Sequence, residues 1–224
     1  TAPIAQELRV RVGTELVSTI PVGVPPVHRD HDIMTAEEIG VVVVGRGEDL
    51  SAYRAFLEGL AVATAERPDV RVFMELRGPH AHDVWRLVDR FELHAVVSSL
   101  TDAAPYRRLL TECDLLVVPE RTEGVRTIVL EAMAQGMLVL ASGLPMIDSF
   151  DAESTGIIVS GATSTAWRDA LRRVLSNPDE TRAIGAAAQR RCRADHSART
   201  HLDELVTTLD RIVGGDSMPF TGAT

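Results

Sequence analysis

Two glutamates eight positions apart, Glu123 and Glu131, are the residues whose types and spacing point most directly to chemistry. The neighbours of Glu131 are apolar, which predicts a well-buried helix: Ile128, Val129, Leu130, Ala132, Met133 and Ala134. A buried carboxylate needs a partner, because an unpaired charge is costly to bury. Free amides near the predicted helix start, at 124–127, favour an anion. These features predict a site in which amides face a phosphate and Glu131 accepts hydrogen bonds from sugar hydroxyls.

The stretch that carries the two glutamates, 119–136, lies between two apolar runs at 115–118 and 137–141. Such runs are typical of parallel strands that are covered on both faces. Gly136 is placed to end the intervening helix. In open α/β sheets ligands bind at the carboxyl ends of the strands, where this loop and helix start would lie. The alternative without a ligand is that Glu131 pairs with an arginine and Glu123 caps the helix.

The rest of the chain alternates between strand and helix patterns. Strands are predicted at 17–20, 39–44, 70–76, 95–98, 114–118, 137–141 and 156–159. Helices are predicted at 1–16, 51–66, 84–91, 106–111, 166–175, 179–195 and 196–213. This alternation predicts an α/β, doubly wound domain with a mostly parallel sheet of about six strands and helices on both faces.

Composition excludes several classes of protein. The 224 residues are 45% hydrophobic and 25% charged, which is ordinary for a soluble globular protein. A net charge of −9 disfavours non-specific nucleic-acid binding. No apolar run approaches the roughly 20 residues of a membrane span, although membrane association of another kind is left open. All 23 basic residues are arginine, so the chain has no lysine.

Cys113 and Cys192 form no metal-ligand or redox spacing, which favours a reduced, cytoplasmic compartment. The chain begins at Thr1, so we expect a processed chain or a part of a longer one. No metal and no cofactor is predicted.

The string EGVRTIVLEAMAQG, 123–136, resembles the E-x7-E motif of retaining glycosyltransferases with the GT-B fold, of the group 1 (family 4-like) type. The usual family wording is close to EGFGLxxLEAMAxG. The resemblance implies a nucleotide-sugar donor site in a Rossmann-like, carboxyl-terminal domain. By this analogy Glu131 holds the ribose hydroxyls and Glu123 lies beside the donor sugar. The amides after Gly124 would contact the diphosphate or the sugar.

The resemblance also implies roles for loops that precede this motif. Arg46, after the first strand, matches an arginine that contacts donor phosphates, which makes Arg46 and Glu123 the predicted catalytic residues. The loop at Gly78 falls near the donor, and Leu100 and Thr101 fall near its base. The full set of predicted donor-binding residues is Arg46, Gly47, Gly78, Leu100, Thr101, Glu123, Gly124, Val125, Arg126, Thr127 and Glu131.

The chain departs from the family pattern at two places. The family's phosphate-binding lysine, which follows the arginine, has no counterpart, and Glu48, Asp49 and Leu50 stand nearby instead. Val125, Arg126 and Thr127 replace the usual Phe-Gly-Leu. Our hypothesis is that Arg126 supplies the missing positive charge. A nicotinamide cofactor is disfavoured, because the G-x-G at 45–47 lacks a third glycine at position 50.

These implications divide the chain into four parts. Residues 1–37 are the end of a preceding domain and a linker, and 38–195 are the donor-binding domain. Residues 196–213 are a terminal helix that packs back across the cleft, and 214–224 are a flexible tail. The expected function is transfer of a sugar from a nucleotide-diphosphate sugar to an unknown acceptor, with retention, by an enzyme whose amino-terminal, acceptor-binding domain is missing here.

Two alternatives stay open. One is a non-catalytic nucleotide-sugar-binding module, or pseudoenzyme, without the phosphate-binding lysine. The other is a different GT-B-fold enzyme, such as a sugar-nucleotide 2-epimerase.

Overall fold

The computed structural model describes residues 8–10, 20–25, 32–65, 67–76, 78–100, 110–121, 127–143, 150–161 and 163–213. Five of the predicted site residues lie outside these ranges: Thr101, Glu123, Gly124, Val125 and Arg126. Most of the predicted elements at 1–16, 17–20 and 106–111 also lie outside them, as does the tail at 214–224.

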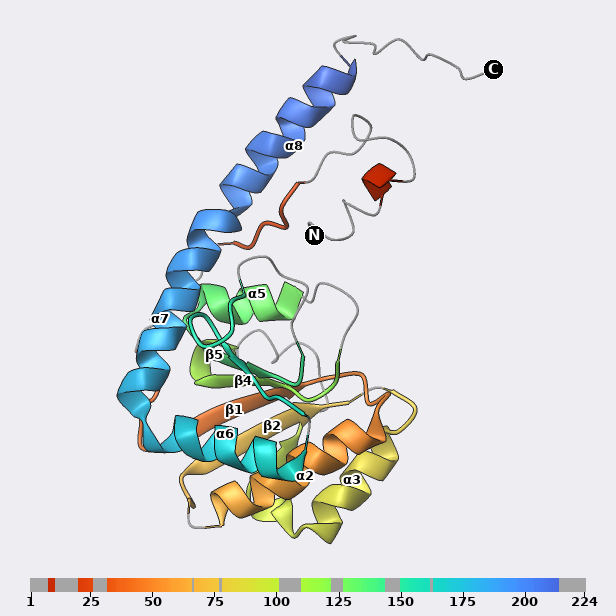
Figure 1. Cartoon of the computed structure of the whole chain (residues 1–224), viewed down its shortest axis with the longest axis vertical. Coiled ribbons are helices and arrows are strands. Elements are labelled where there is room, and N and C mark those ends of the chain that lie inside the picture. The colour runs from red at the N-terminus through yellow and green to blue at the C-terminus, as the bar shows by residue number, and fades with distance from the viewer. Residues whose placement is uncertain are drawn as a thin grey trace.

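The described residues form one parallel sheet with the strand order β3-β2-β1-β4-β5-β6 (Figure 1). The strands are β1 (Ile39–Val44), β2 (Val70–Glu75), β3 (Val97–Ser99), β4 (Leu115–Val118), β5 (Leu138–Ala141) and β6 (Ile157–Ile158). The helices are α2 (Leu50–Thr64), α3 (Ala81–Arg90), α5 (Thr127–Ala134), α6 (Ser164–Ser176), α7 (Pro178–Asp195) and α8 (Ala198–Val213). The doubly wound α/β fold predicted from the sequence is confirmed, and it is Rossmann-like.

Alternation along the strands divides the core into two layers, because successive side chains of a strand point to opposite faces of the sheet. In β1, Val41 and Val43 pack with α2, α3 and α6 on one face. Val42 and Val44 pack with α5 and α7 on the other face. Figure 1 shows these two helical layers with the sheet between them. Burial on both faces explains why the strands read as continuous apolar runs.

Local signals set the starts of the helices. The Asp49 side chain accepts hydrogen bonds from the amides of Ser51 and Ala52, at 2.9 and 3.1 Å, and so caps α2. Thr163 caps α6 through the amide of Ala166, at 3.2 Å. Pro178 stands in the first turn of α7, where a missing amide costs nothing.

One predicted strand was misplaced by two residues at its start. The expected strand at 95–98 is instead a 3-10 turn at Leu93–Ala95 followed by β3. Glu92 has a positive φ of 55°, so the chain turns sharply after α3 before it can extend. The pairing partner of β3 is β2, with Val97 opposite Val72.

Helix α8 extends beyond the sheet and its covering helices (Figure 1). The segment 20–25 runs beside its start: Val24 pairs with Ser197, and the Val24 amide donates to the His196 carbonyl at 2.8 Å. Side chains tighten this junction, because ring nitrogens of His196 and His201 lie 2.9 and 2.6 Å from the carbonyls of Val22 and Pro21. No helix in the described ranges is long and apolar enough to cross a membrane.

Candidate functional site

The strand order reverses between β1 and β4, and such a switch point is where ligands bind in doubly wound sheets. The two strands pair directly, with Val43 opposite Val117. The loop after β1, 45–49, and the loop that starts at Pro119 after β4 therefore emerge side by side at the carboxyl edge. Both loops belong to the predicted donor site.

A buried glutamate at the start of the second loop joins the two loops. Glu120 is 4% exposed, and its carboxylate accepts three backbone hydrogen bonds from the first loop. The amide of Arg46 donates to Oε2 at 2.7 Å. The amides of Glu48 and Asp49 donate to Oε1 at 2.5 and 2.9 Å. Bonds from amides to a carboxylate are stronger than neutral ones, so Glu120 determines the backbone of the 46–49 loop.

Close packing leaves no room for a side chain where β1 enters this loop. A Cβ atom on Gly45 would lie 1.7 Å from the Tyr53 hydroxyl and 2.8 Å from Glu120 Oε2. Tyr53 is fully buried in α2, the helix that the loop leads into. Glycine at position 45 thus lets Tyr53, Glu120 and the backbone of the loop meet at one point.

The loop after β2 packs against the 45–49 loop. A Cβ atom on Gly78 would lie 1.6 Å from the Arg46 carbonyl oxygen. The amide of His80, at the start of α3, donates to the Gly47 carbonyl at 3.0 Å. Gly47 has a positive φ of 69°, which glycine adopts without strain. Arg46, Gly47 and Gly78, three of the predicted donor residues, are therefore brought into contact.

The Arg46 side chain is largely exposed to solvent. It is 75% exposed, and its Nη1 lies 3.6 Å from Oε1 of Glu48. An exposed pair of this kind contributes little to stability. Arg46 is the sole basic side chain on the 45–49 loop, which also carries Glu48 and Asp49.

The remaining described site residues lie on neighbouring elements. The amide of Leu100, directly after β3, donates to the Met74 carbonyl at 3.1 Å. Thr127 is exposed at the start of α5, and Glu131 is half-buried one turn later, on the same side of the helix.

Two residues of this site, Glu120 and Gly45, are not among those predicted from the sequence. A charged residue directly after a wholly apolar strand and a proline is a signal that could have singled out Glu120, since it needs partners in a buried place. The sequence carries no sign that those partners would be amides 71 to 74 positions away. Gly45 was read only as part of a glycine pattern.

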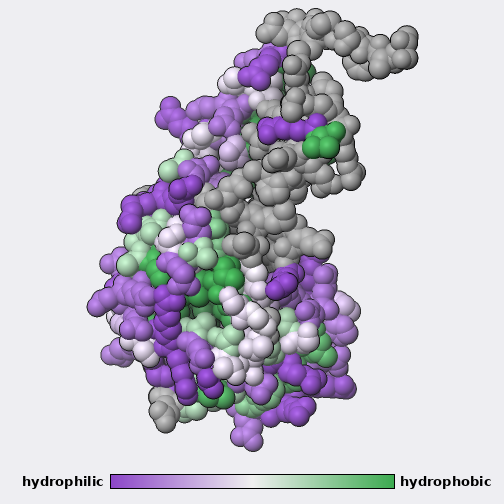
Figure 2. Space-filling model, in the orientation of Figure 1, coloured by the Kyte–Doolittle hydropathy of each residue, from purple (hydrophilic) through white to green (hydrophobic). Residues whose placement is uncertain are grey.

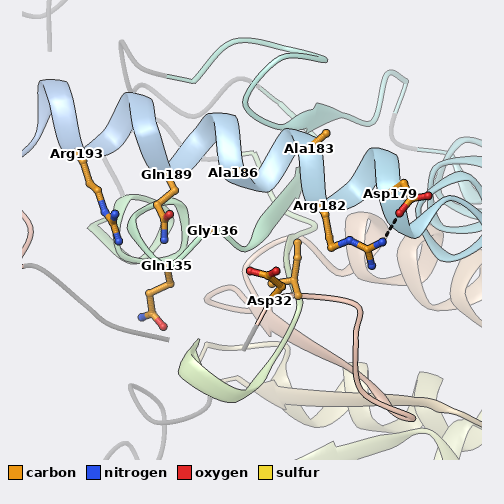
Figure 3. Close-up of a pocket in the computed structure, with 10 residues that line it drawn as sticks. Asp32, Gln135, Gly136, Asp179, Arg182, Ala183, Ala186, Gln189 and Arg193 are labelled. Carbon is orange, nitrogen blue, oxygen red and sulfur yellow. Dashed lines mark hydrogen bonds and ion pairs between the residues drawn. The ribbon is translucent and has the colours of Figure 1, made fainter. Parts of the chain in front are cut away.

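A pocket of about 570 Å³ lies elsewhere, between the turn after α5 and helix α7 (Figure 3). Gln135, Gln189 and Arg193 line one end, and Asp32 and Arg182 line the other. Gly136 leads into β5, so the pocket is at the amino edge of the sheet, opposite the switch point. Of the predicted donor residues that the structure describes, none lines it. Arg182 is held by Asp179 and by the Met34 carbonyl.

Residues 38–177 match the family described as glycosyl transferases group 1. The chain belongs to this family. A relative, D-inositol 3-phosphate glycosyltransferase of Thermobispora bispora, is 29% identical over 171 residues, which cover 71% of this chain and 39% of that protein. The chain spans about two fifths of the length of the curated relatives that it matches.

Solved structures share the fold. TarM of S. aureus, in complex with UDP among other ligands, superposes with a TM-score of 0.77 at 15% identity, over 92% of this chain and 42% of that one. The carboxyl-terminal domain of LpcC, a group 1 family protein of Francisella tularensis, superposes with a TM-score of 0.63 at 18% identity, over 71% of this chain and 87% of that one. At these identities the likeness shows the Rossmann-like half of a GT-B fold.

Proposed function

We propose that this chain is the donor-binding, carboxyl-terminal half of a retaining glycosyltransferase. It binds a nucleotide-diphosphate sugar at the switch point, and an amino-terminal half supplies the acceptor. Arg46 and the start of α5 stabilise the leaving diphosphate, Glu131 holds the ribose, and Glu123 lies at the sugar.

The observation that carries this proposal is the joined pair of loops at the carboxyl ends of β1 and β4. Glu120 holds the backbone of one loop while the Arg46 side chain of that loop stays exposed. A cation on a fixed backbone at a switch point suits a phosphorylated ligand. Membership in the glycosyl transferases group 1 family supports the same reading.

Titration calorimetry of the chain with UDP, ADP and GDP tests donor binding. We expect one of these nucleotides to bind, and Arg46→Ala to weaken that binding about tenfold, the usual worth of a charge-assisted contact. Arg172→Ala, which removes a cation on the outer side of α6, is the matched control and should bind as wild type does. If none of the three nucleotides binds, the donor-site assignment is wrong.

Arg126→Ala tests whether this arginine replaces the absent lysine. We expect the variant to bind the preferred nucleoside diphosphate more weakly than wild type does, because a positive charge at a helix start adds to the field on the phosphates. A variant that binds as tightly as wild type would refute charge replacement.

Helix α8 carries the proposed contact with the amino-terminal half. Its side chains Leu202, Val206 and Leu209 are 56%, 55% and 49% exposed, and their spacing puts them on one face. The side of α8 visible in Figure 2 is largely hydrophilic. We expect Val206→Asp to abolish turnover reconstituted with a separate amino-terminal half while donor binding by the chain stays unchanged. Reconstituted turnover that survives this change would argue against the contact.

A non-catalytic donor-binding module is the second candidate. The charges of the 45–49 loop favour it, because Glu48 and Asp49 stand where a second cation is expected. Nucleotide binding without turnover, in the presence of the amino-terminal half and a panel of sugar nucleotides, would support the module over the enzyme.

A further inference from the structure

Glu120 is a buried carboxylate that accepts three amides of the loop that carries Arg46. Its Oε2 accepts from the amide of Arg46 itself, and its Oε1 accepts from the amides of Glu48 and Asp49. Three amides that converge on one point form an anion-binding concavity. In this chain the anion is a side chain of the protein.

Because the Glu120 carboxylate occupies the concavity of the 46–49 loop, fewer groups of this loop remain to bind a phosphate. The amides of Arg46, Glu48 and Asp49 are committed to Glu120, so they are not donors to a ligand. The Arg46 guanidinium, by contrast, is 75% exposed. Its Cα position is determined from three sides: by Glu120 through the Arg46 amide, by the close approach of Gly78 to the Arg46 carbonyl, and by the bond from His80 to Gly47.

We infer that Glu120 is a positioning residue of the donor site: its carboxylate replaces a phosphate in the loop concavity and thereby presents Arg46 to the diphosphate of the nucleotide. This inference rests on the proposed function. It assigns the Arg46 side chain to phosphate binding at this loop and removes the amides of Arg46, Glu48 and Asp49 from that task.

The test uses UDP as the probe and a double-mutant cycle between Glu120→Ala and Arg46→Ala. Glu120→Ala removes all three bonds, and we expect it to weaken UDP binding about tenfold. In the Arg46→Ala background the same change should have no further effect, because Glu120 acts through Arg46. Additive losses, unchanged binding, or tighter binding by Glu120→Ala would each overturn the inference. Tighter binding would mean that the carboxylate competes with phosphate for the amides.

Glu120→Gln keeps the size of the side chain and serves if Glu120→Ala does not fold. An amide offers one acceptor oxygen in place of two, so at least one of the three loop amides loses its partner. We expect a loss of UDP affinity of about threefold and faster hydrogen exchange at the amides of Arg46, Glu48 or Asp49. Exchange as slow as in wild type, together with unchanged affinity, would overturn the positioning role.

Asp114→Asn is the matched control, because Asp114 is also buried and also accepts backbone amides, but at the opposite edge of the sheet. It should lower stability and leave UDP affinity unchanged. If wild-type protein binds no UDP, ADP or GDP, the proposed function fails and this inference fails with it. If wild type binds UDP and Glu120→Ala binds it equally well, the inference alone fails.

Discussion

Each end of strand β4 is flanked by a buried carboxylate that accepts backbone amides, but the two carboxylates hold different segments of the chain. Asp114 precedes the strand, is 3% exposed, and accepts the amides of Met34 and Gly40 at 2.6 and 2.8 Å. Glu120 follows it, is 4% exposed, and accepts the amides of the 46–49 loop. Each carboxylate therefore ties one end of β4 to one end of β1.

What differs is the segment that each carboxylate holds. At the amino edge the amides belong to the start of β1 and the segment before it. The backbone is closely packed there, because a Cβ atom on Gly40 would lie 2.9 Å from the Cys113 Cα. At the carboxyl edge the amides belong to a loop that presents an exposed arginine. The direction of the parallel strands makes one edge structural and the other available to a ligand.

Asp114→Ala should have the largest effect on stability and none on the ligand site. Loss of the carboxylate leaves two part-buried amides without their acceptor, which lowers the free energy of unfolding by about 3 kcal/mol. Urea denaturation measures this loss, and calorimetry with UDP on the folded protein should give wild-type affinity. A large fall in UDP affinity would mean that the two edges are coupled.

Gly78→Ala should affect the carboxyl edge alone. The new Cβ atom would meet the Arg46 carbonyl, a backbone atom that cannot yield without moving the loop, at a cost of about 2 kcal/mol in stability. We also expect weaker UDP binding. Gly161→Ala is the control: its φ is +84° but nothing lies within 4 Å of the added atom. The control should cost about 1 kcal/mol from backbone strain and leave UDP binding intact.

Asp49→Ala should have the smallest effect, and a pH-dependent one. The Ser51 hydroxyl, followed by the amides of Ala52 and Ser51, holds the pKa of Asp49 below its ordinary value. The native carboxyl thus binds its proton less readily than the unfolded one. Its contribution, about 1 kcal/mol for a helix cap, is complete above the ordinary pKa. It is lost as the pH falls through the lower native pKa.

The free energies of unfolding of wild type and Asp49→Ala should therefore differ fully at pH 7, begin to converge below about pH 3.9, and meet only below the lower native pKa of Asp49. Thr163→Ala, which removes the neutral cap of α6, should show a similar loss that does not depend on pH. A constant difference for Asp49→Ala across this range would mean that its cap works without the charge.

The fold could be predicted because its signals are local. Apolar runs of four to six residues that are bounded by glycine, proline or acidic residues, such as 39–44 and 115–118, are typical of buried strands. Capping residues such as Asp49 and Thr163 act on amides two or three positions away, so the starts of α2 and α6 were predicted to within two residues. Helix α3 begins three residues before the predicted start at 84, because no side chain caps it. The 3-10 turn before β3 escaped prediction because a positive φ at a glutamate has no sequence signature.

The candidate site likewise has a part that the sequence predicted and a part that it did not. The family resemblance predicted that Arg46, Gly47 and Gly78 would belong to one site, and the structure brings them into contact because the ends of parallel strands share an edge. The partners of Glu120 depended on which strands became neighbours. A carboxylate binds whichever amides the fold brings to it, and the adjacency of β1 and β4, far apart in the chain, follows from how all six strands pack together. Only the folded chain could therefore place an acid from one loop inside the backbone of another.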